Sequence, residues 1–296
     1  MKPIGDSEMK LASVVRREFG ENDAKRDAGL TTPANVKRFD DIIYGTNDME
    51  WQRLDVYRPK EETGTLPVIL NVHGGGWVYG SKEIYQFYCM SLAEHGYAAV
   101  NFSYRLAPEN RYPSSFEDLN TVCAWVYEHA TEYGFDTDHV FAVGDSAGAH
   151  MLALYAAALT NAAYGKQCGY ALQKKLSFTA LALNCGVYDL DHTERTLRNM
   201  VHMLRGDSTE DALLNPVLHI TDSFPPSFVM TAVGDFLIEQ PDYLIPVLQE
   251  KKVPHVFKCY GSEDAPLGHV FHANVRLKEA GICNEEEMEF FRSFLK

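Results

Sequence analysis

The sequence lacks closely spaced cysteines and long apolar runs. Its six cysteines are scattered over 296 residues without any Cys-x-x-Cys spacing, which argues against both a disulfide framework and a zinc ribbon. No apolar run approaches the length of a membrane span, and the first residues lack the apolar stretch of a signal peptide. We therefore expect a cytoplasmic protein, with no membrane association, whose cysteines are reduced core residues.

Basic charge is also scarce, because 27 Lys and Arg residues face 41 Asp and Glu residues, for a net charge of -14 at pH 7. Such a field repels nucleic-acid phosphates and anionic membrane surfaces, so neither is an expected partner. Internal repeats, low-complexity tracts and linkers rich in Pro, Gly or Ser are missing as well. The chain is therefore predicted to form one domain over residues 1-296.

Signatures of metals and phosphates are equally missing. There is no His-Glu-x-x-His pattern and no cluster of histidines and cysteines, so no metal site is predicted. The glycines at 74–76 fit neither Gly-x-x-x-x-Gly-Lys-Ser/Thr nor Gly-x-Gly-x-x-Gly, which disfavours a phosphate loop.

What the sequence does contain is a serine at a sharp bend. Four apolar residues at 140–143 predict a buried strand, Gly-Asp-Ser-Ala-Gly follows at 144–148, and an almost wholly apolar segment to residue 159 predicts a buried helix. A strained strand-to-helix turn exposes the hydroxyl of Ser146, and its small neighbours allow the backbones to crowd there. An ordinary glycine-rich turn is the alternative, since short matches to this pattern occur by chance.

Other apolar runs alternate with helical patterns along the chain. An antiparallel pair of strands is predicted within residues 36–57, and the chain is predicted to close with two helices, near 273–280 and 284–295. Further buried strands are predicted at 66–72, 97–102, 176–185, 226–235 and 254–260. The pattern predicts an α/β fold with a mostly parallel central sheet and helices on both faces.

The strand at 66–72 ends in His73-Gly-Gly-Gly-Trp77. Three successive glycines let another group approach the backbone closely. Beside a nucleophilic serine, that group is the carbonyl oxygen of a substrate, which amide N–H groups of the glycine loop and of the residue after the serine bind as an oxyanion. The loop is therefore interpreted as an oxyanion hole.

A serine needs a general base, and the base needs an acid that orients it. His269 is the preferred base because it follows the strand at 254–260 and is preceded by Gly268, which suits a tight loop. His272, one turn further on, stays open as a rival.

Asp235 is the preferred acid because it directly follows the strand at 226–235. The next helix is predicted to begin at Phe236, and the rivals Glu239 and Asp242 lie within that helix or at its start.

Four motifs stand in order along the chain: His-Gly-Gly-Gly-Trp at 73–77, Tyr-Arg-Leu-Ala-Pro-Glu at 104–109, Gly-Asp-Ser-Ala-Gly at 144–148 and Asp-x-Leu-x-Glu at 235–239. Together they resemble the hormone-sensitive-lipase branch of the α/β-hydrolase carboxylesterases, also called HGGG-type, from about residue 40 to the end. The resemblance implies an α/β-hydrolase fold with a small helical cap from 1–35 and 189–222, and an esterase without a cofactor. The family usually has a glycine after the catalytic histidine, where this chain has Val270.

The resemblance also assigns roles to single residues. The catalytic triad would be Ser146, Asp235 and His269, the oxyanion donors would be the amides of Gly75, Gly76 and Ala147, and His73 would brace the loop. Bulky side chains expected near the site, those of Trp77, Tyr79 and Tyr104, make the substrate-pocket candidates.

The predicted function is thus a serine carboxylesterase that hydrolyses short-chain esters, acetyl esters above all, through an acyl-enzyme intermediate. An amidase or peptidase with the same triad is one alternative, because a triad alone does not choose the leaving group. A ligand-binding protein without catalysis on the same scaffold is the other. The expected partner is a small-molecule ester, and the terminal helices and strand edges are compatible with a homodimer.

Overall fold

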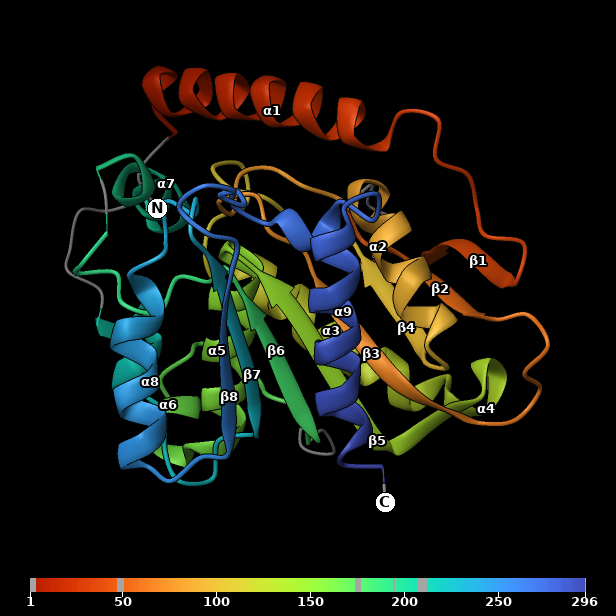
Figure 1. Ribbon diagram of the computed structural model, residues 1–296. Coiled ribbons are helices and arrows are strands. Elements are labelled where there is room, and N and C mark those ends of the chain that lie inside the picture. The colour runs from red at the N-terminus through yellow and green to blue at the C-terminus, as the bar shows by residue number, and fades with distance from the viewer. Residues whose placement is uncertain (1–3, 47–50, 174–176, 194, 207–211, 296) are drawn as a thin grey trace.

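The structure is a computed structural model that describes residues 4–46, 51–173, 177–193, 195–206 and 212–295. Within these residues eight strands form one sheet in the order β1-β2-β4-β3-β5-β6-β7-β8 (Figure 1). The strands are β1 (Val36–Ile43), β2 (Arg53–Pro59), β3 (Leu66–Val72), β4 (Ala98–Phe102), β5 (Phe135–Asp145), β6 (Ala180–Asn184), β7 (Ser227–Ala232) and β8 (His255–Tyr260). Pairs β1·β2 and β2·β4 are antiparallel and the others are parallel, which confirms the predicted mostly parallel sheet.

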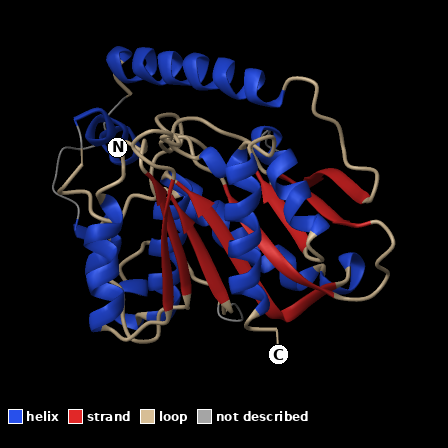
Figure 2. Ribbon diagram, viewed as in Figure 1, coloured by secondary structure: helices blue, strands red, loops and turns tan. Residues whose placement is uncertain are grey.

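Helices cover both faces of this sheet (Figure 2). They are α1 (Asp6–Asp27), α2 (Lys82–Glu94), α3 (Ser114–Glu128), α4 (Ala130–Tyr133), α5 (Ala147–Thr160), α6 (Ala162–Gly165), α7 (Arg195–Arg205), α8 (Gln240–Glu250) and α9 (Lys278–Arg292), with short 3-10 turns η1 (Ala212–Leu214), η2 (Pro216–Leu218) and η3 (Phe271–Ala273). Side chains of α2 and α9 join one hydrophobic core, and those of α3, α5 and α8 join the other. The prediction of helices on both faces is confirmed.

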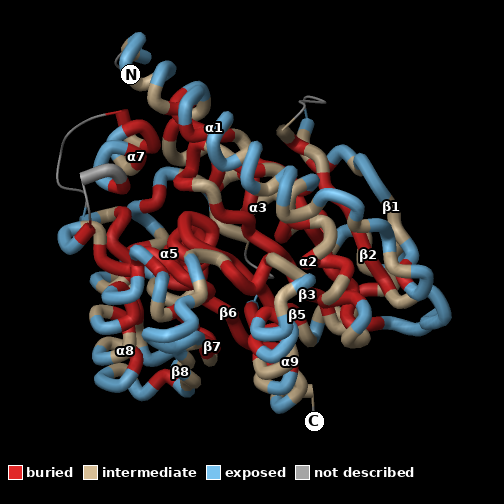
Figure 3. Tube along the Cα trace, turned by 45° about the horizontal axis from the view of Figure 1, so that its top comes forward, coloured by how far each residue is buried: buried red, intermediate tan, exposed pale blue. Residues whose placement is uncertain are grey.

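The central strands supply both cores because successive side chains of a strand point to opposite faces. In β3, Val68 and Leu70 belong to one core and Ile69 to the other. In β5, Val140 and Phe141 divide in the same way. A strand buried on both sides reads as a continuous apolar run, which is why these strands were predictable (Figure 3).

Two predictions about the second half of the chain are wrong. The chain closes with one helix, α9, instead of two, because Gly281 is accommodated within it at a place where a β-carbon would meet no atom of another element within 4 Å. The helix predicted to start at Phe236 begins only at Gln240, after a turn through residues 236–239. That turn follows directly on Asp235.

The six cysteines are all free thiols, and five are buried as expected. Cys259 is exposed because it lies on β8, the edge strand of the sheet, whose residues are nowhere fully buried. Among the described helices, none has the length and apolar composition that crossing a bilayer demands.

Helix α1 lies apart from the two helical layers and runs across the ends of the strands (red in Figure 1). Arg16 attaches it to the body by donating to the carbonyl oxygens of Val78 (2.8 Å) and Ala107 (3.0 Å) and by an ion pair with Glu109 at 2.7 Å. Of the cap predicted from 1–35 and 189–222, the structure describes α1 and α7, whereas residues 1–3, 194 and 207–211 lie outside the described part.

Candidate active site

Ser146 stands at the bend between β5 and α5. Its backbone has φ 51 and ψ -118, a left-handed φ that costs energy in any residue except glycine. The flanking glycines permit the bend, because a β-carbon on Gly144 would lie 2.8 Å from the backbone of Gly148. The amide of Ser146 donates to the carbonyl oxygen of Asn184 at 2.9 Å, which anchors the bend to β6.

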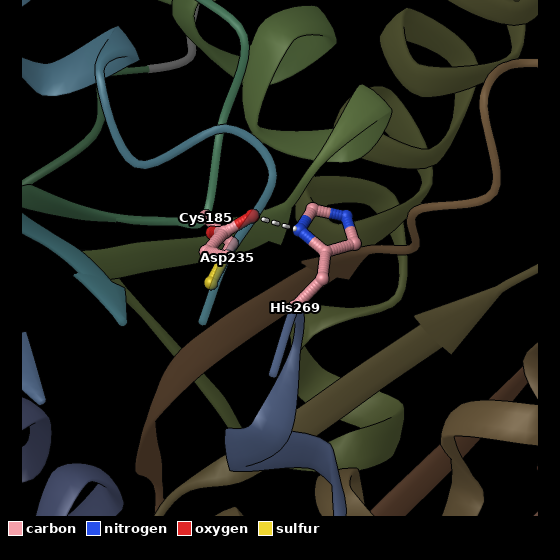
Figure 4. Close-up of side chains that lie close together, drawn as sticks. All are labelled: Cys185, Asp235 and His269. Atoms are coloured by element: carbon pink, nitrogen blue, oxygen red, sulfur yellow. Dashed lines mark hydrogen bonds and ion pairs between the residues drawn. The ribbon is translucent and has the colours of Figure 1, made fainter. Parts of the chain in front are cut away.

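Three predicted site residues from separate loops meet at this bend, and Figure 4 shows two of them, Asp235 and His269. Nε2 of His269 lies 2.9 Å from Oγ of Ser146, and Nδ1 of the same ring lies 2.7 Å from Oδ1 of Asp235. A neutral imidazole that donates through Nδ1 presents the lone pair of Nε2 to the hydroxyl. The arrangement can therefore take a proton from Ser146 and stabilise the resulting imidazolium with a carboxylate.

The carboxylate of Asp235 is buried and well supplied with donors. Besides His269, it accepts hydrogen bonds from the amide of Leu237 (2.8 Å) and the hydroxyl of Thr231 (3.1 Å). Burial by itself would raise its pKa, but the hydrogen bonds, led by that of His269, outweigh burial, so the pKa of Asp235 lies below its ordinary value. Asp235 is therefore ionised at neutral pH, as an acid that stabilises an imidazolium must be.

Cys185 is a neighbour of this pair that the sequence did not suggest. Its sulfur, Oδ of Asp235 and a ring nitrogen of His269 lie within 4.8 Å of one another, a donor set that suits a soft divalent ion (Figure 4). The hydrogen bond between Asp235 and His269 already occupies two of the three donors, and burial raises the pKa of the thiol well above its ordinary value. A metal would have to displace that bond and remove the thiol proton.

The rival residues lie elsewhere. His272 is buried with its ring edge-on to Tyr88 at 5.1 Å, and burial lowers its pKa to about 3. Glu239 and Asp242 are exposed at the start of α8. Hence His269, and not His272, forms the hydrogen bond with Ser146. Asp235, and not Glu239 or Asp242, forms the hydrogen bond with His269.

The glycine loop after β3 faces the same point. Gly75 and Gly76 have φ values of 117 and 59, which favour glycine over other residues. Among the described residues, the amides of Gly75, Gly76 and Ala147 donate to no protein acceptor. Gly75, Gly76 and Ser146 line one cavity, so the glycine loop and the serine face the same space.

His73 holds this loop from behind. Its ring stacks on Tyr104 with centroids 4.0 Å apart, and its Nδ1 lies 2.8 Å from the carbonyl oxygen of Gly74. Burial lowers the pKa of His73 to about 4, so the ring is neutral at physiological pH. Asp145 secures the same loop from the serine side by accepting the amide of Gly74 at 3.2 Å and the hydroxyl of Tyr85 at 2.5 Å.

The cavity above Ser146 has a volume of about 750 Å³. Of the three pocket candidates only Tyr79 lines it. The predictions for Trp77 and Tyr104 are wrong, because both side chains are buried in the core. Trp77 turns inward at a positive φ and packs edge-on against His150 at 5.0 Å, while Tyr104 is the ring that supports His73.

Distant segments supply the cavity walls that the sequence did not reveal. Helix α7 contributes Leu197 and Met200, and a β-carbon on Gly76 would lie 2.5 Å from the sulfur of Met200. The turn after Asp235 contributes Phe236, whose ring contacts His269. The wall from α1 consists of Phe19, Asn22, Asp23 and Arg26. Only Phe236 had a sequence signal, as the residue that follows the predicted acid.

The loop that carries His269 is tied to the loop of Asp235. Gly234 and Gly268 form an isolated parallel bridge, and the amide of Gly234 donates to the carbonyl oxygen of Leu267 at 2.9 Å. Val270, in place of the family's usual glycine, has φ 58, a conformation that is strained for a β-branched residue. The loop thus keeps the shape that a glycine would favour.

Comparisons with known proteins agree with this architecture. The BD-FAE family model matches residues 54–244. The probable carboxylic ester hydrolase LipM of Mycobacterium tuberculosis is 33% identical over 252 residues, which cover 79% of this chain and 57% of LipM. The versiconal hemiacetal acetate esterase of Dothistroma septosporum is 38% identical over 102 residues, or 34% of this chain and 31% of that protein. The chain thus spans about half or less of the length of these curated relatives.

Among solved structures, esterase B of Lactobacillus rhamnosis inhibited with a C4-C4 SN3 tributyrin phosphonate is similar over almost its full length. The two chains share 26% identity with a TM-score of 0.90, over 99% of this chain and 96% of the other. The similarity in fold therefore extends over nearly the whole of both chains.

Proposed function

The chain belongs to the BD-FAE family and to the hormone-sensitive-lipase-like carboxylesterases of the α/β-hydrolase superfamily, and on this premise we propose that it hydrolyses short-chain carboxylic esters. The observation that carries the proposal is the chain of contacts from Ser146 through His269 to Asp235, at 2.9 and 2.7 Å, beside amides that have no protein acceptor. Acyl transfer needs a nucleophile, a base that an acid orients, and donors for the oxyanion, all at one place.

In the proposed acylation step, Oγ of Ser146 attacks the carbonyl carbon of the ester and His269 takes its proton. The developing oxyanion accepts hydrogen bonds from the amides of Gly75, Gly76 and Ala147. His269 then gives the proton to the alkoxide as the carbon–oxygen bond breaks, so that the alcohol leaves and the acyl group stays on Ser146.

Deacylation repeats the sequence with water. His269 removes a proton from a water molecule, whose oxygen attacks the acyl carbon, and the carboxylic acid leaves as Ser146 regains its proton. Asp235 remains ionised throughout, because its low pKa favours the carboxylate that pairs with the imidazolium. No other reactant is needed.

Preference for short acyl groups, acetyl in particular, is part of the proposal. Met200 of α7 lies directly against Gly76 and limits the room above the oxyanion loop. The name of the versiconal hemiacetal acetate esterase and the tributyrin phosphonate bound to esterase B point to acetyl and butyryl groups in relatives. Both observations favour a small acyl site.

The test is hydrolysis of p-nitrophenyl esters of increasing acyl length by the intact protein and by Ser146→Ala. Activity should peak at acetate or butyrate and fall at least about 10⁴-fold in the variant. Asp235→Asn should lose a comparable factor, because it leaves His269 with the wrong tautomer.

Two results would contradict the proposal. If the intact protein and Ser146→Ala were equally inactive on every ester, a binding protein on this scaffold would be favoured. Comparable turnover of the p-nitroanilide with the same acyl group would favour an amidase.

A further inference from the structure

Phe236 is a large aromatic side chain left in solvent beside His269. It stands in the turn between β7 and α8, directly after Asp235, and it is 56% exposed although it lines the cavity. Its ring centroid lies 4.3 Å from that of His269, and the two planes are inclined by 50°. The backbone of the turn fixes this position, since the amide of Ile238 donates to the carbonyl oxygen of Asp235 at 3.1 Å.

The reaction geometry says which part of the substrate meets this ring. In acylation, His269 delivers its proton to the oxygen of the leaving alcohol, so that oxygen must come within about 3 Å of Nε2. The oxyanion points to Gly75 and Gly76, on the other side of the acyl carbon. The alcohol group therefore extends from His269 along the face that Phe236 covers.

The size of the cavity leaves most of its room to the alcohol. An acetyl group has three non-hydrogen atoms, each about as large as a water molecule with its share of roughly 30 Å³. The cavity measures about 750 Å³. If the acyl group is small, the alcohol is the part of the substrate that fills the cavity.

The two charged groups on the opposite wall, Asp23 and Arg26, are already paired. The carboxylate of Asp23 accepts from the hydroxyl of Tyr79 at 2.7 Å and from Arg26 at 2.8 Å. Arg26 also donates to both oxygens of Asp27. A sugar would have to break these bonds to satisfy its hydroxyls, whereas an aromatic alcohol needs only apolar contact. Apolar side chains on the His269 side of the cavity are Phe236, Leu237, Val270, Phe271 and Leu277.

We propose that Phe236 is the specificity-determining residue of the alcohol subsite and that the alcohol of the substrate carries an aromatic ring, which packs on the exposed face of Phe236. The proposal rests on the esterase function proposed above. It explains why a ring of this size stays exposed in the free protein, since the substrate covers it during the reaction. Offset-stacked or edge-on aromatic pairs add about 0.5–1.5 kcal/mol beyond the burial of their area.

The test compares benzyl acetate with cyclohexylmethyl acetate, two esters with the same acyl group, similar size and alcohols of similar acidity. The intact protein should show a kcat/KM about twofold to twelvefold higher for benzyl acetate. Phe236→Leu should bring the ratio of the two esters close to one, and Phe236→Tyr should preserve it. Phe257→Leu is the matched control, because Phe257 is 42% exposed on β8, outside the cavity lining.

A ratio near one in the intact protein, or an equal loss for both esters in Phe236→Leu, would overturn the inference. The ratio of benzyl butyrate to benzyl acetate should stay constant in Phe236→Leu, because the acyl site is separate; a large change would place Phe236 in the acyl site and overturn the inference as well.

Binding separates failure of this inference from failure of the esterase function. In the Ser146→Ala background, calorimetric titration should show tighter binding of benzyl alcohol than of cyclohexylmethanol, and Phe236→Leu should abolish the difference. Absence of any difference overturns the subsite even if esters are hydrolysed. A clear difference in a protein without ester hydrolysis supports the aromatic subsite and rejects the proposed reaction.

Discussion

A β-carbon on Gly148 would lie 1.9 Å from the carbonyl oxygen of Val72. The first turn of α5 thus packs directly on the end of β3, and this contact sets the position of Ser146 relative to the glycine loop that follows Val72. The two halves of the candidate site, serine and oxyanion amides, are joined by this approach of two backbones.

Gly148→Ala should therefore destabilise the protein strongly. Neither the backbone of β3 nor that of α5 can move away without displacing a core layer, so we expect a loss of about 1–3 kcal/mol or more in the free energy of unfolding. Urea unfolding followed by circular dichroism measures it. Gly281→Ala is the control, because the added β-carbon would meet no atom of another element within 4 Å, and the substitution should gain about 0.5–1 kcal/mol. Equal effects of the two substitutions would contradict the contact.

Val270→Gly should leave stability almost unchanged. Relief of the left-handed conformation at φ 58 returns about 1–2 kcal/mol, which offsets the lost side-chain contacts and the greater freedom of glycine in the unfolded chain. Val256→Gly, on β8, removes a half-buried valine without any such relief and should cost about 1–2 kcal/mol or more. The urea concentrations at the midpoints of unfolding of the two variants measure this difference. An equal loss of stability in both variants would show that Val270 is unstrained.

Glu287 should make the protein less stable as the pH rises. This carboxyl is buried in α9, and burial raises its pKa to about 7 against the opposing hydrogen bonds from Asn184 (2.7 Å) and Tyr88 (3.1 Å). A carboxyl whose pKa is raised on folding contributes fully below its unfolded value of 4.5 and loses that contribution as the pH rises through 7.

The matched variant is Glu287→Gln, which stays neutral. Relative to it, the intact protein should lose about 3 kcal/mol of unfolding free energy between pH 4.5 and pH 7.5. Urea unfolding of both proteins at several pH values gives the difference, and parallel pH profiles would contradict a buried acid with a raised pKa.

Arg16→Ala should loosen α1 from the cavity. The guanidinium joins α1 to Val78, Ala107 and Glu109, and the loss of such bonds at about 1 kcal/mol each raises the detached population about fivefold or more. Trypsin cleavage within α1 should accelerate by that factor, and KM for short esters should rise because α1 forms a wall of the cavity.

Arg17→Ala is the control for Arg16. Arg17 is largely exposed, and among the described residues its ion pair is with its neighbour Glu18, at 4.0 Å. If both variants were cleaved at the same rate as the intact protein, Arg16 would not be the tether of α1.

Local signals made the serine, the glycine loop and the positions of the strands along the chain predictable from the sequence. The bend at Ser146 needs small residues within two positions on either side, and the buried parallel strands read as apolar runs because both of their faces are covered. Asp235 and His269 were predictable because each stands in the loop after a late strand. In the structure His269 contacts Ser146, and Asp235 contacts His269. Each of these features depends on residues close together in the chain.

The surroundings of the serine were decided by tertiary structure alone. Trp77 and Tyr104 belong to site motifs in the sequence, yet both side chains turn into the core. Packing sets the backbone direction at Trp77, and it places Tyr104 inside to stack on His73. Met200 and Phe19 reach the cavity from helices far away in the chain. No periodicity within a segment reports which distant segment it will face, since that choice depends on how whole layers fit together. The sequence thus determined the chemistry that the site can perform, and the tertiary packing determined the shape of the space above it.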